Sequence, residues 1–259
     1  MRPQAVLHAM NKYLKNLNRI EFVVTMACTG RCIHCSEGGH EGCAGHIDAG
    51  AASEAVRKIC GLYRITSLMT FGGEPLLYPD VVCAIQKTAA ETGIPGRQVI
   101  TNGYFTKDAA KIGQVARDLA DSGVNDLLLS VDAFHQETIP LEPVLCFASC
   151  AAEAGIPVRL SPAWLVSPED DNIYNIRTRE ILSAFEPLGI PTGSGNVVFP
   201  SGNALKYLRA YFDENAAESS PYDEDPEDVR TVSFEPDGSV LNGNIYRTDI
   251  LEIMRTYRP

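Results

Sequence analysis

Short apolar runs and longer amphipathic stretches alternate along the chain, which indicates a regular succession of strands and helices. An apolar run bounded by turn residues predicts a strand that is buried on both faces. Such runs occupy residues 19–25, 67–71, 98–101, 126–131, 157–160 and 196–199. Between and after them, apolar residues recur every three or four positions, as on one face of a helix. The helical segments are 53–62, with Ser53 as the expected N-cap, 79–92, 108–122, 142–154, 173–188 and 204–212.

Six strands that are each followed by a helix predict an α/β fold. Helices of this length allow right-handed crossovers, so the strands are expected to lie parallel in one sheet. The expected architecture is a partial (β/α)6 TIM-like barrel, in which chemistry collects at the C-terminal ends of the strands. Cys28, Gly72, Asn102, Asp132 and Trp164 fall at those ends.

Other patterns precede and follow the six units. Residues 1–18 are amphipathic and predict an N-terminal helix. Residues 213–228 are acidic and rich in Ser and Pro, which is typical of a solvated linker. Pro236-Asp237-Gly238 then predicts a hairpin turn, and a closing helix is expected at 248–257. The chain thus divides into an N-terminal helix, a barrel, a linker and a hairpin with a helix, at 1–18, 19–212, 213–228 and 229–259.

Composition and charge narrow the class of protein. The 259 residues are 45% hydrophobic, which is enough for the core of one barrel. The net charge of −11 disfavours a nucleic acid as partner, because its phosphates would be repelled. Neither a signal peptide nor an apolar stretch of about 18 residues occurs, so the expected location is the cytoplasm, without membrane contact. In that reducing compartment the eight cysteines are expected to be thiols or metal ligands.

Three cysteines lie close together directly after the first predicted strand. Cys28, Cys32 and Cys35 have the spacing C-x3-C-x2-C, and Gly30 helps the loop to turn tightly. Three thiolates on one loop can hold one face of a 4Fe–4S cluster and leave one iron open. A zinc site, with His34 or Cys43 as fourth ligand, and three incidental thiols remain as alternatives.

The cysteine spacing resembles the signature of the radical S-adenosylmethionine (SAM) superfamily, and three further motifs follow in order. Thr70-Phe-Gly-Gly-Glu-Pro75 resembles the GGEP motif of the second strand end. Ile100-Thr-Asn-Gly103 resembles the TNG motif of the third, and Ser130-Val-Asp132 the S-x-D motif of the fourth. The resemblance covers about residues 19–200, and four motifs in register are more specific than one.

The resemblance implies a set of cofactors and partners. Cys28, Cys32 and Cys35 would hold a 4Fe–4S cluster whose open iron binds SAM. An electron from a donor such as flavodoxin or ferredoxin would cleave SAM, and the resulting 5′-deoxyadenosyl radical would take a hydrogen atom from a peptide or small-molecule substrate. Glu74 would accept from the ammonium group of SAM. The full set of expected SAM contacts is His34, Gly72, Gly73, Glu74, Pro75, Asn102, Ser130, Asp132, Ser161 and Trp164.

Candidate catalytic residues lie in two polar segments. Asp132-Ala-Phe-His-Gln-Glu137 stands at the predicted barrel mouth, where Asp132 and His135 could orient substrate or move a proton. The alternative is a loop whose histidine caps a helix. The Gly-rich polar loop 38–46 is the second segment, and its Cys43, His40 and His46 are candidate ligands of a second metal. Cys43 is also a candidate hydrogen donor, and the loop could equally have no special role.

The C-terminal segment resembles the start of a SPASM or twitch extension, which binds auxiliary clusters in this superfamily. That pattern has a cysteine near the position of Asn242, yet no cysteine follows Cys150. The extension is therefore expected to lack an auxiliary cluster. The sixth strand end departs from the pattern as well. The subgroup commonly has the sequence G-R-A there, and Asn203 stands at the position of its arginine.

The leading interpretation is a radical SAM enzyme that acts on a peptide or small metabolite, with peptide or natural-product maturation favoured. One alternative is an activase that places a glycyl radical on a partner enzyme. A zinc-stabilised binding module without catalysis is an alternative from another class.

Overall fold

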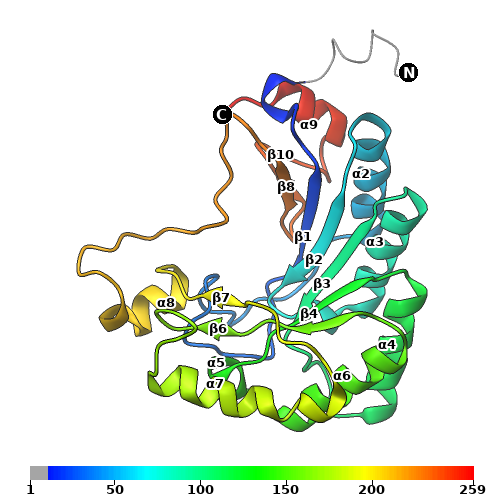
Figure 1. Ribbon diagram of the computed structural model, residues 1–259. Coiled ribbons are helices and arrows are strands. Elements are labelled where there is room, and N and C mark those ends of the chain that lie inside the picture. Colours follow the sequence, from blue (N-terminus) through cyan, green and yellow to red (C-terminus); the bar gives the residue numbers. More distant parts are fainter. Residues whose placement is uncertain (1–10) are drawn as a thin grey trace.

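The computed structural model describes residues 11–259, which form an open α/β barrel (Figure 1). The main sheet has the strand order β10-β9-β8-β1-β2-β3-β4-β5. Its five barrel strands run parallel, as the sequence predicts; they are β1 (Arg19–Thr25), β2 (Ser67–Gly72), β3 (Gly96–Thr101), β4 (Asp126–Leu129) and β5 (Val158–Leu160). The convex face is covered by α2 (Ala49–Leu62), α3 (Pro79–Glu91), α4 (Ala109–Asp121) and α6 (Leu141–Glu153).

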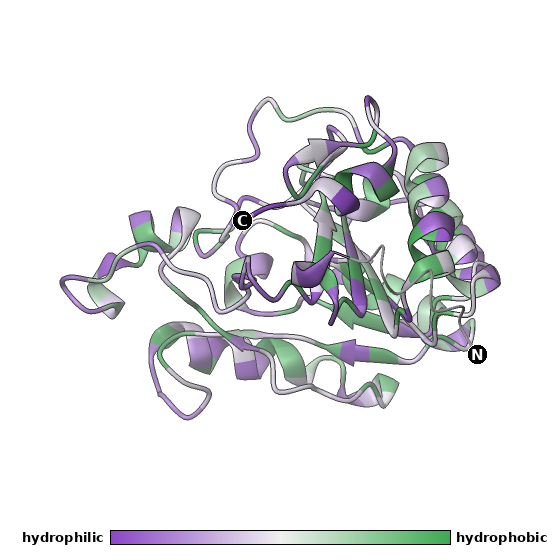
Figure 2. Ribbon diagram, turned by 90° about the horizontal axis from the view of Figure 1, so that it is seen from above, coloured by the Kyte–Doolittle hydropathy of each residue, from purple (hydrophilic) through white to green (hydrophobic). Residues whose placement is uncertain are grey.

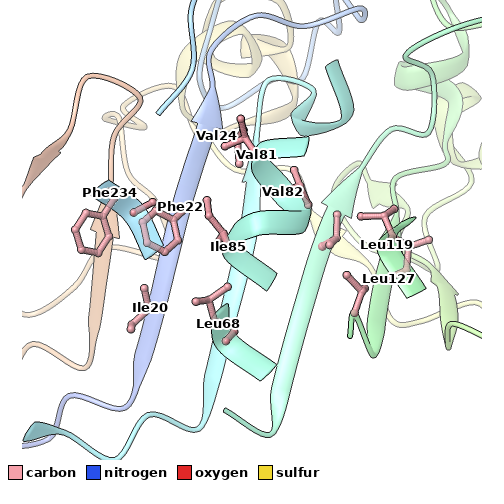
Figure 3. Packing of buried hydrophobic residues seen from close by; sticks show 14 of the residues in the cluster. Ile20, Phe22, Val24, Leu68, Val81, Val82, Ile85, Leu119, Leu127 and Phe234 are labelled. Atoms are coloured by element: carbon pink, nitrogen blue, oxygen red, sulfur yellow. The ribbon is translucent and has the colours of Figure 1, made fainter. Parts of the chain in front are cut away.

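The main core lies between this sheet and its helices. Ile20 and Phe22 of β1 point toward Ile85 of α3, and all three side chains are fully buried (Figure 3). Burial of each such side chain contributes about 1.5–3 kcal/mol. Figure 2 shows the hydrophobic residues gathered in the strands and along the inner sides of the helices. Since side chains alternate along a strand, Arg19 and Glu21 lie on the opposite, concave face of β1.

The helix α2 begins four residues earlier than the predicted one, and its N-cap is Asp48 rather than Ser53. The Asp48 carboxylate accepts a hydrogen bond of 2.7 Å from the backbone N–H of Ala51. Ser53 lies inside the helix and is buried. The prediction was wrong because the apolar pattern starts weakly at 49–52, where Ala and Gly carry little hydrophobic signal.

The sixth predicted strand does not join the main sheet. β7 (Asn196–Val197) pairs only with β6 (Ala163–Trp164), in a separate two-stranded sheet. Pro162, which has no backbone N–H, separates β5 from β6 and ends the ladder with β4. The barrel therefore stays open on this side. The chain there continues through α7 (Ile173–Ser183), η3 (Glu186–Leu188), α8 (Gly202–Tyr207) and η4 (Arg209–Tyr211).

The C-terminal hairpin extends the main sheet rather than standing apart from it. β8 (Thr231–Phe234) pairs parallel with β1, and Phe234 stacks on Phe22 with 4.6 Å between ring centroids. β9 (Ser239–Val240) and β10 (Gly243–Asn244) complete the edge, and α9 (Ile250–Thr256) packs beside α2. Residues 213–228 contain no helix or strand and run from η4 to β8 past the open side of the barrel (Figure 1).

Most of the predicted N-terminal helix lies outside the described residues. The described part, from residue 11, contains the short helix η1 (Lys12–Leu14), and Leu14 and Leu17 are buried. None of the helices within residues 11–259 has the length and apolar character that crossing a bilayer requires.

Candidate cluster and cofactor site

The three cysteines of the C-x3-C-x2-C motif lie on one tight loop at the C-terminal end of β1. A Cβ placed on Gly30 would lie 3.7 Å from Cys28 Sγ and 3.3 Å from Cys32 Sγ, so both sulfurs face the same small space. The Gly30 N–H donates to Cys28 Sγ over 3.3 Å, and the Cys35 N–H donates to the Cys32 carbonyl over 3.3 Å. We refer to residues 28–38 as the cluster loop.

Burial makes these thiols hard to ionise. Removal from water raises the pKa of Cys28 to about 11, and raises the pKa values of Cys32 and Cys35 above that of an ordinary thiol. The Glu74 carboxylate adds to the increase at Cys28, and Asp132 adds to it at Cys32. Three thiolates in this partly buried loop therefore need compensating positive charge, which the irons of a cluster would supply. The donor set fits a thiolate-held cluster.

The end of β2 packs directly against the chain that enters the cluster loop. Gly72 has a φ of +143°, which L side chains rarely adopt, and a Cβ there would lie 2.4 Å from the Thr25 carbonyl oxygen. A Cβ on Gly73 would lie 2.3 Å from the Ala27 carbonyl oxygen. The Gly73 N–H donates to the Thr25 carbonyl over 2.8 Å. The two glycines thus permit the backbone of β2 to support the cluster loop.

Glu74 joins the ends of β2 and β3. Its side chain is fully buried, and Oε1 accepts from the Leu76 N–H and from Thr101 Oγ1 over 2.9 and 2.7 Å. Oε2 accepts from the Asn102 N–H over 2.8 Å. Pro75 follows as the first residue of η2 (Pro75–Leu77), whose N-cap is Glu74. Three internal donors leave this carboxylate with little acceptor capacity for a ligand.

Glu74 makes stability depend on pH. Burial raises its pKa from 4.5 to about 7, although Thr101 and the two backbone donors oppose the increase. The folded state therefore holds a proton that the unfolded state has lost between about pH 4.5 and 7. Relative to Glu74→Gln, the wild type is expected to lose about 3 kcal/mol of its free energy of unfolding as pH rises through this window. Urea unfolding of both proteins at several pH values checks this; a constant difference would contradict it.

Asn102 links β3 to the cluster loop. Its Nδ2 donates to Thr29 Oγ1 over 3.2 Å and lies 3.7 Å from Cys28 Sγ, while its Oδ1 accepts from the Tyr104 N–H. Hydrogen bonds to ligand sulfurs tune the potential of iron–sulfur clusters. Ser130 and Ser161 follow β4 and β5, and alternation places both on the concave face. These residues surround the same end of the barrel.

Asp132 and His135 form a buried pair at the end of β4. Both Asp132 carboxylate oxygens lie 2.9 Å from His135 Nδ1, and Oδ2 also accepts from the Ala163 N–H over 2.9 Å. Asp132 is the N-cap of α5 (Ala133–Gln136). Burial alone would raise the pKa of Asp132, but His135 holds it well below its usual range. Burial alone would lower the pKa of His135, but the Asp132 carboxylate raises it. The pair favours a charged imidazolium beside the cluster loop.

His34 packs between this pair and the cysteines. Its ring stacks on Phe134 with 4.7 Å between centroids and meets the edge of His135 at 4.8 Å. Its Nδ1 is buried without a hydrogen-bond partner, and burial lowers its pKa to about 4. One ligand atom each from Cys32, His34 and His135 lie within 4.8 Å of one another. His34 therefore presents a flat neutral ring within the cluster loop, against Phe134 and His135.

Two other candidates lie elsewhere. Cys43 is exposed, on a loop in which its N–H donates to the His40 carbonyl. Trp164 is buried in the small sheet, and its indole N–H donates to the Ser194 carbonyl over 2.9 Å. Cys43 is therefore accessible to solvent, whereas Trp164 contributes to the packing of the small sheet.

Sequence reasoning named the histidines of the loop 38–46 only as candidate ligands of a second metal, and it did not identify His40 as a neighbour of Cys35. Its Nε2 lies 3.3 Å from Cys35 Sγ, and its Nδ1 lies 2.7 Å from the Met26 carbonyl oxygen. Nothing in the spacing points to it, because the polar Gly-rich loop gives no register relative to Cys35.

Comparison with known proteins agrees with this geometry. Residues 22–166 match the family model of the radical SAM superfamily. The chain is 29% identical to the GTP 3′,8-cyclase of Desulforamulus reducens over 141 residues, which are 50% of this chain and 38% of that protein. It is 24% identical to the GTP 3′,8-cyclase of Moorella thermoacetica over 210 residues, which are 73% of this chain and 62% of that protein. The chain thus spans less than two thirds of either cyclase.

Solved structures share the fold at low sequence identity. The structure of Streptococcus suis SuiB bound to S-adenosylmethionine has a TM-score of 0.59 and 14% identity, over 92% of this chain and 65% of that one. The structure of anSMEcpe with bound AdoMet has a TM-score of 0.57 and 12% identity, over 92% of this chain and 79% of that one.

Proposed function

Because the chain belongs to the radical SAM superfamily, we propose that it abstracts a hydrogen atom from a peptide or small metabolite, with peptide or natural-product maturation favoured. The enzyme depends on SAM and a 4Fe–4S cluster, and it requires a substrate and a reductant. The observation that supports the proposed site most is that Cys28, Cys32 and Cys35 lie on one loop at the end of β1, with the Cys28 and Cys32 sulfurs beside Gly30, and that the ends of β2 and β3 support this loop. Flavodoxin or ferredoxin is the proposed reductant.

In this proposal each part of the site has a separate task. Cys28, Cys32 and Cys35 hold the cluster, and the chemistry that the bound cluster supplies is one-electron cleavage of SAM to methionine and a 5′-deoxyadenosyl radical. Asn102 donates toward the Cys28 sulfur and keeps Thr29 in place. The ring of His135 is oriented by Asp132 so that Nε2 is free to hold a proton at the barrel mouth.

The concave face of the barrel bears on the choice of substrate. Arg19 pairs with Glu21 over 2.5 Å and also donates to Gln98, and Arg159 pairs with Asp126 over 2.8 Å. Both of these arginines are thus paired with carboxylates of the protein itself, which leaves them poorly suited to bind a triphosphate. This charge balance supports a neutral or cationic substrate, such as a peptide, over the GTP on which the named cyclases act.

A direct comparison with GTP tests this part of the proposal. The reconstituted enzyme is expected to form 5′-deoxyadenosine at a rate that GTP changes by less than about twofold, with no loss of GTP. The cyclase of Moorella thermoacetica, assayed in parallel, is the positive control. Consumption of GTP together with 5′-deoxyadenosine formation would overturn the proposed substrate class.

The sequence left two alternative functions, a zinc-stabilised binding module and a glycyl-radical activase. The chain belongs to an enzyme superfamily whose cysteine motif binds an iron–sulfur cluster. This membership argues against the hypothesis of a zinc-stabilised binding module. The glycyl-radical activase stays a prediction, and its substrate would be a partner protein rather than a small metabolite.

A further inference from the structure

The segment that follows β7 binds residues 32–38 of the cluster loop, whereas Gly72 and Gly73 contact the chain that enters this loop. Asn203 Nδ2 donates to the Cys32 carbonyl over 3.1 Å and to the Gly38 carbonyl over 3.2 Å. The Asn203 N–H donates to the Cys35 carbonyl over 2.8 Å. A single residue therefore binds the carbonyls of two expected cluster ligands and the end of their loop.

The two residues before Asn203 bring it this close. Ser201 Oγ donates to the Ser36 carbonyl over 3.1 Å. Gly202 has a φ of +51°, and a Cβ on it would lie 2.2 Å from the Ser36 carbonyl oxygen and 2.7 Å from that of Cys35. Only glycine can sit there without moving the loop. We call residues 201–203 the latch.

The latch is also held from its other side. The Ser219 N–H donates to the Pro200 carbonyl over 3.1 Å, and Ser201 Oγ lies 3.4 Å from Glu218 Oε1. The latch therefore lies between the cluster loop and the acidic segment 213–228. These contacts hold the backbone of the latch in place, so the Asn203 side-chain amide can hold the cluster loop in one conformation.

We propose that Asn203 is a positioning residue that sets the spacing of Cys32 and Cys35 by tying their carbonyls together, and thereby controls how firmly the cluster is held. The proposal rests on the proposed function only in that the three cysteines hold a cluster. An arginine at this position would bring a longer charged side chain, whereas the short amide of asparagine reaches two carbonyls at once. Asn203 touches no reacting atom and acts through the cysteine backbone.

Variants at two asparagines test the latch. Asn203→Ala removes the amide, and Asn203→Asp keeps its shape but replaces the donor by a carboxylate that faces two carbonyls. Asn196→Ala is the matched control, because Asn196 lies in the same segment and its amide oxygen accepts from exposed Tyr222. Groups that orient metal ligands typically change metal affinity by about 10- to 100-fold, so both Asn203 variants are expected to release iron to a chelator faster by about that factor. The control is expected to match the wild type.

Two further readouts separate positioning from a general structural effect. The electron paramagnetic resonance spectrum of the reduced cluster is expected to change in both Asn203 variants and to match that of the wild type in Asn196→Ala. In the cluster-free proteins, amide hydrogen exchange over residues 32–38 is expected to be faster in both variants. Unchanged exchange and iron release in Asn203→Asp would overturn the proposal. If Asn203→Ala does not fold, the same measurements of iron release and hydrogen exchange on Asn203→Asp and Ser201→Ala test the proposal.

Failure of the proposed function has a different signature. In that case the wild type itself takes up no iron–sulfur cluster, while the exchange measurement on cluster-free protein still shows whether the latch holds the loop. Equal exchange in all variants overturns the latch whatever the wild type binds.

Discussion

Cys32→Ala is expected to abolish both cluster binding and SAM cleavage. Cys32 is the most buried of the three motif cysteines, and its carbonyl is one anchor of the loop. The two remaining thiolates are not expected to hold a 4Fe–4S cluster, because a second iron, besides the one left open, would then lack a protein ligand. Iron content and 5′-deoxyadenosine formation are both expected to fall by more than about 100-fold, beyond the effect of removing an orienting group.

The matched control for this variant is Cys43→Ala. Cys43 is exposed and its side chain lies outside the convergence of Cys28 and Cys32. It is expected to keep full iron content and full SAM cleavage without substrate. A Cys32→Ala protein that retains the cluster and full SAM cleavage would contradict the assignment of Cys32 as a cluster ligand.

Gly73→Ala is expected to destabilise the protein by about 3 kcal/mol, the upper end of the usual cost of overpacking. The new Cβ would lie 2.3 Å from the Ala27 carbonyl oxygen and 2.8 Å from that of Met26, and both are backbone atoms. Either β2 or the entry to the cluster loop must therefore move. Thermal unfolding is expected to show a Tm lower by roughly 5–10 °C, together with reduced iron content.

Gly61→Ala provides the control for the added methyl group. Gly61 lies in α2, and nothing lies within 4 Å of a Cβ built on it. Alanine there is expected to stabilise the helix by about 0.5–1 kcal/mol, because glycine loses more backbone entropy on folding. Equal Tm values for Gly73→Ala and the wild type would show that the loop and β2 are not packed as described.

The parts of the fold that the sequence predicts well are those with a strong local signal. The apolar runs that form β1 to β5 are bounded by turn residues, and the parallel order follows from the helices between them. The cysteine motif and the GGEP-like motif fall at strand ends, so parallel topology alone brings them together. The convergence of Cys28, Gly73 and Glu74 therefore follows from the positions of these motifs in the sequence.

The features that sequence reasoning missed depend on pairing between distant segments. Local pattern cannot show that Phe234 of β8 stacks on Phe22 of β1, because the two residues are far apart in the chain. The same holds for Asn203, whose departure from G-R-A is visible in the sequence but whose contact with Cys32 and Gly38 is not. The apolar run at 196–199 predicts a strand of the main sheet, and this prediction is wrong because β7 pairs only with β6. An apolar run indicates that a strand is buried, but it does not show with which strand it pairs.

Formation of 5′-deoxyadenosine by the anaerobically reconstituted protein, given SAM and dithionite, decides whether the three cysteines support radical chemistry. We expect 5′-deoxyadenosine to form, and its formation to require each of Cys28, Cys32 and Cys35. A protein that binds zinc at these cysteines, takes up no iron and leaves SAM intact would refute the assignment.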